Sequence, residues 1–213
     1  MKREKFFKIG LGLFVVQFII SALVYKSMPD LMPTHFNINN QADDFSSKAF
    51  ALFGLPLMML GVYLMAYFFT TKDPKVKNQN EKIMAFMLIL IPSLSLIITF
   101  ITIAYVRGIK LDISTWMNVI LGIAFIVIGN YLPKTKRNYT MGIKLPWTLD
   151  SDYVWDKTHR LAGYIWSIGG IFLIIVSLLF KNKISYLFVL FLAMVFIPTI
   201  YSYFLYKKVG KSA

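Results

Sequence analysis

The acids and the histidine of one polar segment are the residues of this sequence best suited to chemistry. Asp150, Asp152 and Asp156 closely precede His159, and carboxylates beside an imidazole are typical of general acid–base catalysis. The same acids have a simpler explanation, because Asp caps the first turn of a helix and faces the positive end of its dipole. We favour this structural interpretation, and a membrane enzyme that uses this Asp/His group stays open as an alternative.

No established catalytic or metal-binding motif accompanies this group. The sequence contains no H-E-x-x-H, no G-x-S-x-G and no phosphate-binding glycine loop. It has no cysteine, and its one other histidine is His35. The sequence therefore predicts no disulfide, no metal site and no cofactor, and we expect a protein that is not an enzyme.

Long uncharged runs indicate the elements that carry these residues. The sequence is 57% hydrophobic and 15% charged, which is too apolar for an ordinary soluble domain. A hydrocarbon core needs about 20 helical residues to cross it, and a helix satisfies its backbone within its own segment. The runs without Asp, Glu, Lys, Arg or His are 9–25, 49–71, 83–106, 113–132, 161–180 and 184–206. The expected fold class is an all-α integral membrane protein with six transmembrane helices.

The basic residues predict the orientation of these helices. Of the 23 Lys and Arg, 17 lie in residues 1–8, 72–82, 133–160 and 207–213, and 6 lie in residues 26–48, 107–112 and 181–183. Cytoplasmic connections carry the excess of Lys and Arg, so the N-terminus and the C-terminus are both predicted to be cytoplasmic. Topology and attraction to membrane lipid then explain the net charge of +13, and we expect no direct nucleic-acid partner.

Few side chains stand out within the runs. Gln17 and Asn118 are expected to form hydrogen bonds between helices, and Gly163, Ser167 and Gly170 share one helix face that predicts a close contact. Ionisable residues, the usual mark of proton and charged-substrate pathways, are absent from the runs as they were delimited. A transporter or exporter of a peptide or small molecule stays open as a second alternative.

The segment 26–48 between the first two runs is expected to be an ordered turn on the outer side. Pro29 and Pro33 hold the chain extended, and the asparagines that follow tolerate a left-handed backbone. His35 and Phe36, next to this turn, are candidates for contact with a ligand arriving from outside. The alternative is that they cap the helices at the membrane interface.

The longest connection, residues 133–160, is expected to be a turn followed by a short helix that leads into the fifth run. Thr148 or Ser151 is expected to cap this helix, and Asp156 to pair with Arg160 four residues later. Two tryptophans suit the membrane interface: Trp147 and Trp155.

A long motif runs through this connection: G-N, then N-x3-G-x-[R/K]-x-P-W-T-L, then V-W-x3-H-R. Its residues here include Asn130, Asn138, Gly142, Lys144, Pro146, Trp147, Thr148, Trp155, His159 and Arg160. This motif closely resembles the signature of the SdpI-type family of bacterial multi-pass immunity proteins. The outer segment with His35, Phe36, Asn37 and Asp43 likewise resembles the small N-terminal membrane domain that often precedes it. Two departures are Asn40 in place of the usual Gly and Lys144-Leu145 in place of the usual Arg-Thr.

The resemblance implies a division into two membrane units. Residues 1–71 would form an N-terminal two-helix unit with the outer loop 26–48. Residues 72–213 would form a four-helix unit with the cytoplasmic loop 133–160.

The resemblance also implies a function, which is protection of a bacterial cell against a secreted peptide toxin at the plasma membrane. In the best-known setting of the family, the toxin-occupied protein also captures a small helix-turn-helix repressor and so takes part in signal transduction. We expect the toxin to face His35, Phe36, Asn37 and Asp43. The loop from Asn138 to Arg160 is expected to maintain the fold or to engage the partner.

Overall fold

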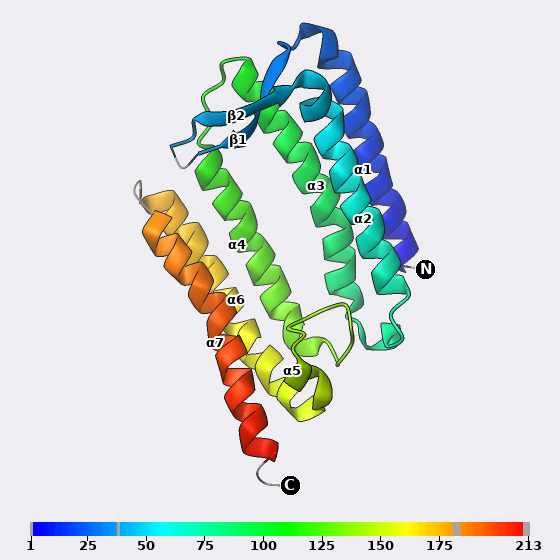
Figure 1. Cartoon of the computed structure of the whole chain (residues 1–213), viewed down its shortest axis with the longest axis vertical. Helices are drawn as coiled ribbons and strands as arrows, with labels where there is room; N and C mark the ends of the chain where they lie inside the picture. Colours follow the sequence, from blue (N-terminus) through cyan, green and yellow to red (C-terminus); the bar gives the residue numbers. More distant parts are fainter. Residues whose placement is uncertain (1, 38, 181–183, 211–213) are drawn as a thin grey trace. The chain divides into compact units, whose positions relative to one another are not determined.

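The computed structural model describes residues 2–37, 39–180 and 184–210, and most of these are helical (Figure 1). The helices are α1 (Lys2–Val24), α2 (Leu55–Thr71), α3 (Glu81–Val106), α4 (Ile113–Tyr131), α5 (Pro146–Asp150), α6 (Asp152–Leu179) and α7 (Ile184–Gly210). Within the described residues, six helices are long and apolar enough to cross a membrane. The predicted six spans are therefore confirmed. The connection 181–183 lies outside the described residues, and the sidedness of the ends stays a prediction.

The fifth span begins earlier than the uncharged run indicated. α6 starts at Asp152 rather than near Leu161, because Ser151 caps it by accepting a hydrogen bond from the Val154 N–H at 3.3 Å. Ser151 is thus one of the two predicted caps. Thr148, the other, lies inside the separate short helix α5.

The chain folds as two compact units. Unit 1 consists of residues 1–68 and 84–114, and unit 2 consists of residues 69–83 and 115–213. Unit 1 contains α1, nearly all of α2 and most of α3, whereas unit 2 contains nearly all of α4 together with α5, α6 and α7. The division at residue 71 that the resemblance implies stays a prediction.

The segment between α1 and α2 in unit 1 contains a β-hairpin rather than the turn that we expected. Strands β1 (Leu31–Phe36) and β2 (Ala42–Ser47) pair antiparallel, with irregular register between Pro33 and Phe36. Met32 of β1 is fully buried and belongs to the apolar core of unit 1. The other buried members of that core are Met28, Ala51, Leu52 and Ile103. The hairpin is therefore fixed to the helices of its unit by the apolar face of one strand.

A buried amide joins α1 to α3 inside unit 1. The Gln17 side chain is fully buried, and its Nε2 donates to the Ser95 carbonyl at 3.1 Å and to the Thr99 hydroxyl at 2.7 Å. Hydrocarbon offers no water to satisfy such a group, so these bonds hold the two helices in register. The prediction for Gln17 is confirmed. Asn118 makes no hydrogen bond of this kind among the residues that the structure describes.

Small residues let α6 approach α4 closely in unit 2. A Cβ built on Gly163 would lie 2.8 Å from the Gly129 carbonyl oxygen, and one built on Gly170 would lie 2.6 Å from the Gly122 carbonyl oxygen. Real side chains essentially never reach such distances. The predicted close helix contact is confirmed, and its partner is α4.

We expect Gly163→Ala to destabilise the protein by about 1–3 kcal/mol, because the added methyl group must push α6 away from α4. Thermal unfolding of the purified protein in detergent measures this change. Gly61→Ala is the matched control, since a Cβ at this helical position meets nothing within 4 Å, and it should leave the midpoint equal or slightly higher. Equal midpoints for the two variants would refute the close α4–α6 contact.

Candidate functional site

The hairpin comprises residues 31–47, and an asparagine side chain stabilises the turn at its tip. Asn37 accepts hydrogen bonds at its Oδ1 from the N–H groups of Asn39 at 2.9 Å and Gln41 at 3.1 Å. Its own N–H donates to the Gln41 carbonyl at 2.8 Å. Asn37 therefore satisfies the backbone of the turn, and this side chain is committed to the hairpin itself.

Asn40 connects the tip to the start of α4 and to Asp112 just before it. Its φ is +60°, in the left-handed region that Gly and Asn tolerate. Its Nδ2 donates to the Asp112 carboxylate at 3.0 Å, and its Oδ1 accepts from the Ser114 N–H at 2.7 Å. Asparagine thus adopts a backbone conformation that suits Gly, the residue that the family resemblance implies here, and adds two bonds that Gly cannot form.

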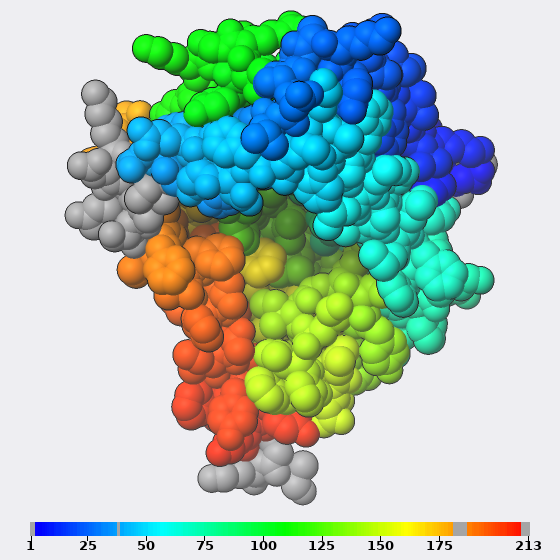
Figure 2. Space-filling view, turned by 45° about the horizontal axis from the view of Figure 1, so that its top comes forward, coloured from blue at the N-terminus to red at the C-terminus, as the bar shows by residue number. Residues whose placement is uncertain are grey.

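The outward face of the hairpin carries a histidine–carboxylate pair. His35 Nδ1 lies 2.6 Å from Asp43 Oδ1, with 64% and 42% of the two side chains exposed. Figure 2 shows the hairpin, in the lighter blue part of the chain, forming part of the molecular surface. Phe36 is half-buried, with its ring edge-on to Tyr105 at 5.0 Å. Of the four predicted toxin-facing residues, His35 and Asp43 are presented to solvent, whereas Phe36 and Asn37 hold the hairpin together.

Residues 133–160, which include the connection from α4, the short helix α5 and the first turns of α6, are called the signature loop below. Asn138 is fully buried in it and accepts at its Oδ1 from the N–H groups of Thr140 at 3.0 Å and Met141 at 2.7 Å. Its Nδ2 donates to the Lys136 carbonyl at 2.9 Å. One buried amide therefore satisfies three backbone groups of a segment that has no regular structure.

His159 closes the same loop from α6. It is buried, its Nε2 accepts from the Ile143 N–H at 3.0 Å, and its Nδ1 lies 2.7 Å from the Trp155 carbonyl. Nδ1 therefore carries the proton of a neutral ring, which stacks on Trp155 at 3.9 Å. Gly142 has a φ of +109° and lies against the imidazole, so that a Cβ there would overlap Nε2. The ring is a structural element with both nitrogens engaged.

Two further motif residues are also buried in unit 2. The Thr148 hydroxyl donates to the Ile143 carbonyl at 2.7 Å and accepts from the Leu145 N–H at 2.9 Å. Trp155 is fully buried, and its Nε1 donates to the Thr135 carbonyl at 2.7 Å. The expectation that Trp155 lies at the lipid interface is therefore wrong, because the loop folds over its indole ring.

Other motif residues are accessible. Asn130, Lys144, Pro146 and Arg160 are exposed, and Trp147 is half-buried with its Nε1 donating to the Ser202 hydroxyl at 2.8 Å. The motif residues thus form two groups. Asn138, Thr148, Trp155 and His159 are buried and are called the buried frame below. The exposed residues are those that a partner can contact.

Sequence reasoning missed Asp73, which joins two segments of unit 2. It is 5% exposed, and its Oδ2 accepts from the Thr140 hydroxyl at 2.7 Å, the Tyr139 N–H at 3.0 Å and Gln79 Nε2 at 3.2 Å. Its Oδ1 accepts from the Lys75 N–H at 2.7 Å. Burial by itself raises the pKa of this carboxyl, but the donated hydrogen bonds outweigh it and hold the pKa below its usual value of 3.8. Its position as an acid at the start of the mainly basic connection 72–82 was the one signal for it.

The acids near residue 150 do not gather around His159. Asp150 accepts from the Tyr206 hydroxyl at 2.6 Å, and Asp152 forms an ion pair with Arg137 at 2.7 Å. Within the described chain Asp156 and Arg160 are not paired, so that predicted ion pair is wrong. The first turn of α6 is held by Arg137 from the signature loop. The geometry favours capping and loop fixation over a shared catalytic site.

We expect Asp73→Asn to destabilise the protein by about 1–3 kcal/mol at neutral pH, because the amide turns an N–H group toward donors that need an acceptor. Denaturant unfolding in detergent measures the loss, with the exposed Asp156→Asn as the matched control of equal charge change. A lowered pKa also means that the stabilisation is present above the unfolded pKa and is lost as the pH falls through the folded pKa. The wild type should therefore lose stability below about pH 4 and Asp73→Asn should lose less; parallel pH curves would contradict the assignment.

Comparisons with known proteins agree with these features. Residues 134–202 match the SdpI/YfhL protein family, and residues 12–60 match a domain of unknown function, DUF1648. The chain is 31% identical over 204 residues to "Immunity protein SdpI" of Bacillus subtilis (strain 168), an alignment that covers 92% of this chain and 94% of that protein. No solved structure matches the chain significantly. The chain belongs to the SdpI/YfhL protein family and is a multi-pass protein of the cell membrane.

Proposed function

We propose that this protein protects a bacterial cell from a secreted peptide toxin, which meets the hairpin of unit 1. The observation that carries the proposal is the 31% identity to an immunity protein along nearly the whole length of both chains. In this proposal both termini are cytoplasmic, as the distribution of Lys and Arg predicts, so the hairpin faces the outside.

The chemistry of the hairpin suits an amphipathic peptide. Beside the exposed pair of His35 and Asp43, the hairpin exposes two large apolar side chains, Leu31 and Phe45. A surface with both polar and apolar side chains can bind such a peptide. Little conformational entropy of the hairpin is lost on binding, because the hydrogen bonds of Asn37 and Asn40 have already fixed its backbone. Phe36 contributes through Tyr105 by holding the strand in place.

We assign a second role to the exposed part of the signature loop, which is capture of a small cytoplasmic helix-turn-helix repressor when toxin is bound. Lys144 and Arg160 are exposed cations of the motif, and each offers donors to acidic or carbonyl groups of a partner. The buried frame around Asn138 and His159 supports them. Toxin-dependent signalling would follow from this capture.

The competing functions have less support. Asp150 and Asp152 are bound to different partners, and both nitrogens of His159 are engaged, which favours a non-enzymatic role. The Nε2 group of the buried Gln17 amide is engaged between α1 and α3, which favours helix packing over the lining of a transport path.

We expect His35→Ala with Asp43→Ala to reduce protection at least about tenfold, because one lost charge-assisted contact to a ligand costs about 1.5–3 kcal/mol. The measurement is the toxin concentration that halves the growth of cells expressing each variant, at equal amounts of protein in the membrane. Asp30→Asn is the control, since this carboxylate is 94% exposed on the same segment and pairs with Lys48. Full protection by the double variant would disprove the hairpin as the toxin site.

We expect Lys144→Ala with Arg160→Ala to keep protection and to abolish capture of the repressor, because both side chains are exposed. Toxin-dependent sedimentation of the repressor with membranes measures capture. Trp155→Ala serves as the contrast, since removal of a fully buried indole should lower the protein level by destabilising the fold. Unchanged sedimentation with the double variant would show that the partner binds elsewhere or that no capture occurs.

A further inference from the structure

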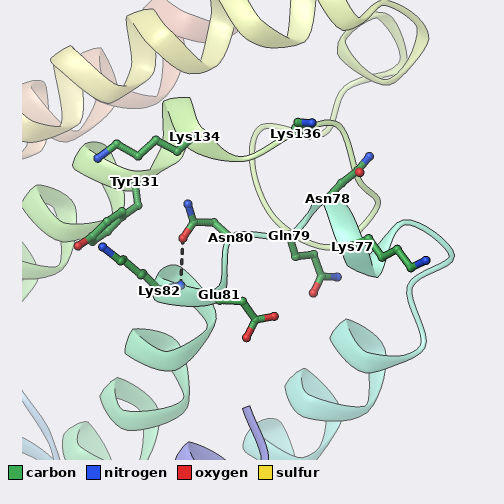
Figure 3. A pocket seen from close by; sticks show the side chains of 9 residues that line it. All are labelled: Lys77, Asn78, Gln79, Asn80, Glu81, Lys82, Tyr131, Lys134 and Lys136. Carbon is green, nitrogen blue, oxygen red and sulfur yellow. Dashed lines mark hydrogen bonds between the residues drawn. The ribbon is translucent and has the colours of Figure 1, made fainter. Parts of the chain in front are cut away.

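A cavity of about 350 Å³ in unit 2 is lined mainly by lysines and amides. Its lining residues are Lys77, Asn78, Gln79, Asn80, Glu81, Lys82, Tyr131, Lys134 and Lys136 (Figure 3). We infer that Lys82, Lys134 and Tyr131 bind the phosphate group of an anionic phospholipid headgroup. This site lies away from the hairpin, it uses Lys134 from the start of the signature loop, and it does not depend on either proposed role.

Two ammonium groups converge on one aromatic ring in this cavity. Lys82 Nζ lies 5.5 Å from the centre of the Tyr131 ring, and Lys134 Nζ lies 4.8 Å from it. Figure 3 shows both side chains directed toward Tyr131, whereas Lys77 points away. Within the described chain neither ammonium group has a carboxylate partner. Two like charges held on one ring repel each other, so an anion that bridges them is favoured.

An amide adds a neutral donor to the same cavity. Asn80 Oδ1 accepts from the N–H groups of Lys82 at 3.0 Å and Ile83 at 3.3 Å. With its oxygen used in this way, its Nδ2 projects into the cavity between the two lysines (Figure 3). Phosphate oxygens accept several hydrogen bonds at once, and this arrangement of donors fits such a group better than it fits a single carboxylate.

The position of the cavity at the ends of two candidate membrane spans favours a lipid over a soluble anion. Lys82 is the second residue of the candidate span Glu81–Val106, and Lys134 is the last residue of the candidate span Ile113–Lys134. Both lysines therefore lie where a span leaves the hydrocarbon, at the level of the headgroups. Tyr131 is half-buried one turn before the end of that span, in the position typical of an interfacial aromatic residue. An anionic lipid can present its phosphate here without leaving the bilayer.

Native mass spectrometry of the full chain with phosphatidylglycerol or with phosphatidylcholine tests the site. Lys82→Gln with Lys134→Gln should weaken phosphatidylglycerol binding about tenfold and leave phosphatidylcholine binding unchanged. The matched control is Lys157→Gln with Lys207→Gln, because each of these lysines lies over a ring of its own, Tyr153 at 5.6 Å and Tyr203 at 4.8 Å. The control pair removes the same charge and should keep nearly full affinity.

Equal losses in the two double variants, or no loss in either, would overturn the site. Inorganic phosphate that binds the wild type with the same dependence on Lys82 and Lys134, and displaces the lipid at millimolar concentration, would overturn the lipid assignment in favour of a free anion. A poly-glutamate peptide that binds there more tightly than the lipid would overturn it in favour of an acidic protein partner.

The wild-type protein provides a second readout that does not depend on folding of a variant. Phosphatidylglycerol should raise its unfolding temperature in micelles more than phosphatidylcholine does, and added salt should reduce the difference. Lys82→Arg with Lys134→Arg keeps both charges and should retain the effect. Equal stabilisation by the two lipids would contradict the site.

Discussion

Backbone groups outside the helices need hydrogen-bond partners, and in this protein buried side chains provide them. In unit 2 residues 135–145 of the signature loop have no regular structure, and Asn138 and Asp73 accept the N–H groups that no helix or strand satisfies. His159 and Thr148 do the same at Ile143 and Leu145. A buried N–H without a partner costs about 1–3 kcal/mol, so each of these side chains is required for the loop to fold as it does. Many residues of the motif that resembles the family signature are therefore there to fold the loop.

The need to satisfy backbone groups also determines which hairpin residues of unit 1 are structural and which are exposed. Asn37 and Asn40 satisfy the turn and join it to the next connection, and Met32 fixes β1 to the apolar core. These residues leave His35 and Asp43 free to face outward on a backbone that is already ordered. Both units thus present exposed polar groups on a backbone that is fixed by side-chain hydrogen bonds. The proposed contacts with a toxin and with a soluble partner fall on the exposed groups.

The sequence predicted what depends on charge and length, and it missed what depends on distant pairing. The uncharged runs predicted the membrane spans because a charged side chain in hydrocarbon is energetically costly. The helical spacing of Gly163, Ser167 and Gly170 predicted the close helix contact. The hairpin was missed because β1 contains Pro33 and β2 contains the consecutive acids Asp43 and Asp44, which break the alternation of a strand. Asp73 was missed because its partners at Tyr139 and Thr140 lie more than sixty residues away. Trp155 was assigned to the interface because its type and position suit both a lipid boundary and a folded loop.

Transfer of the wild-type gene into a strain that the toxin kills tests the central claim most directly. The recipient would be challenged with the peptides secreted by the species from which the chain comes, and survival would be compared with that of cells carrying the empty vector. Immunity predicts survival at toxin concentrations that kill the control cells, with the protein present in the membrane. Equal killing of both populations, with the protein present at normal levels, would contradict the account.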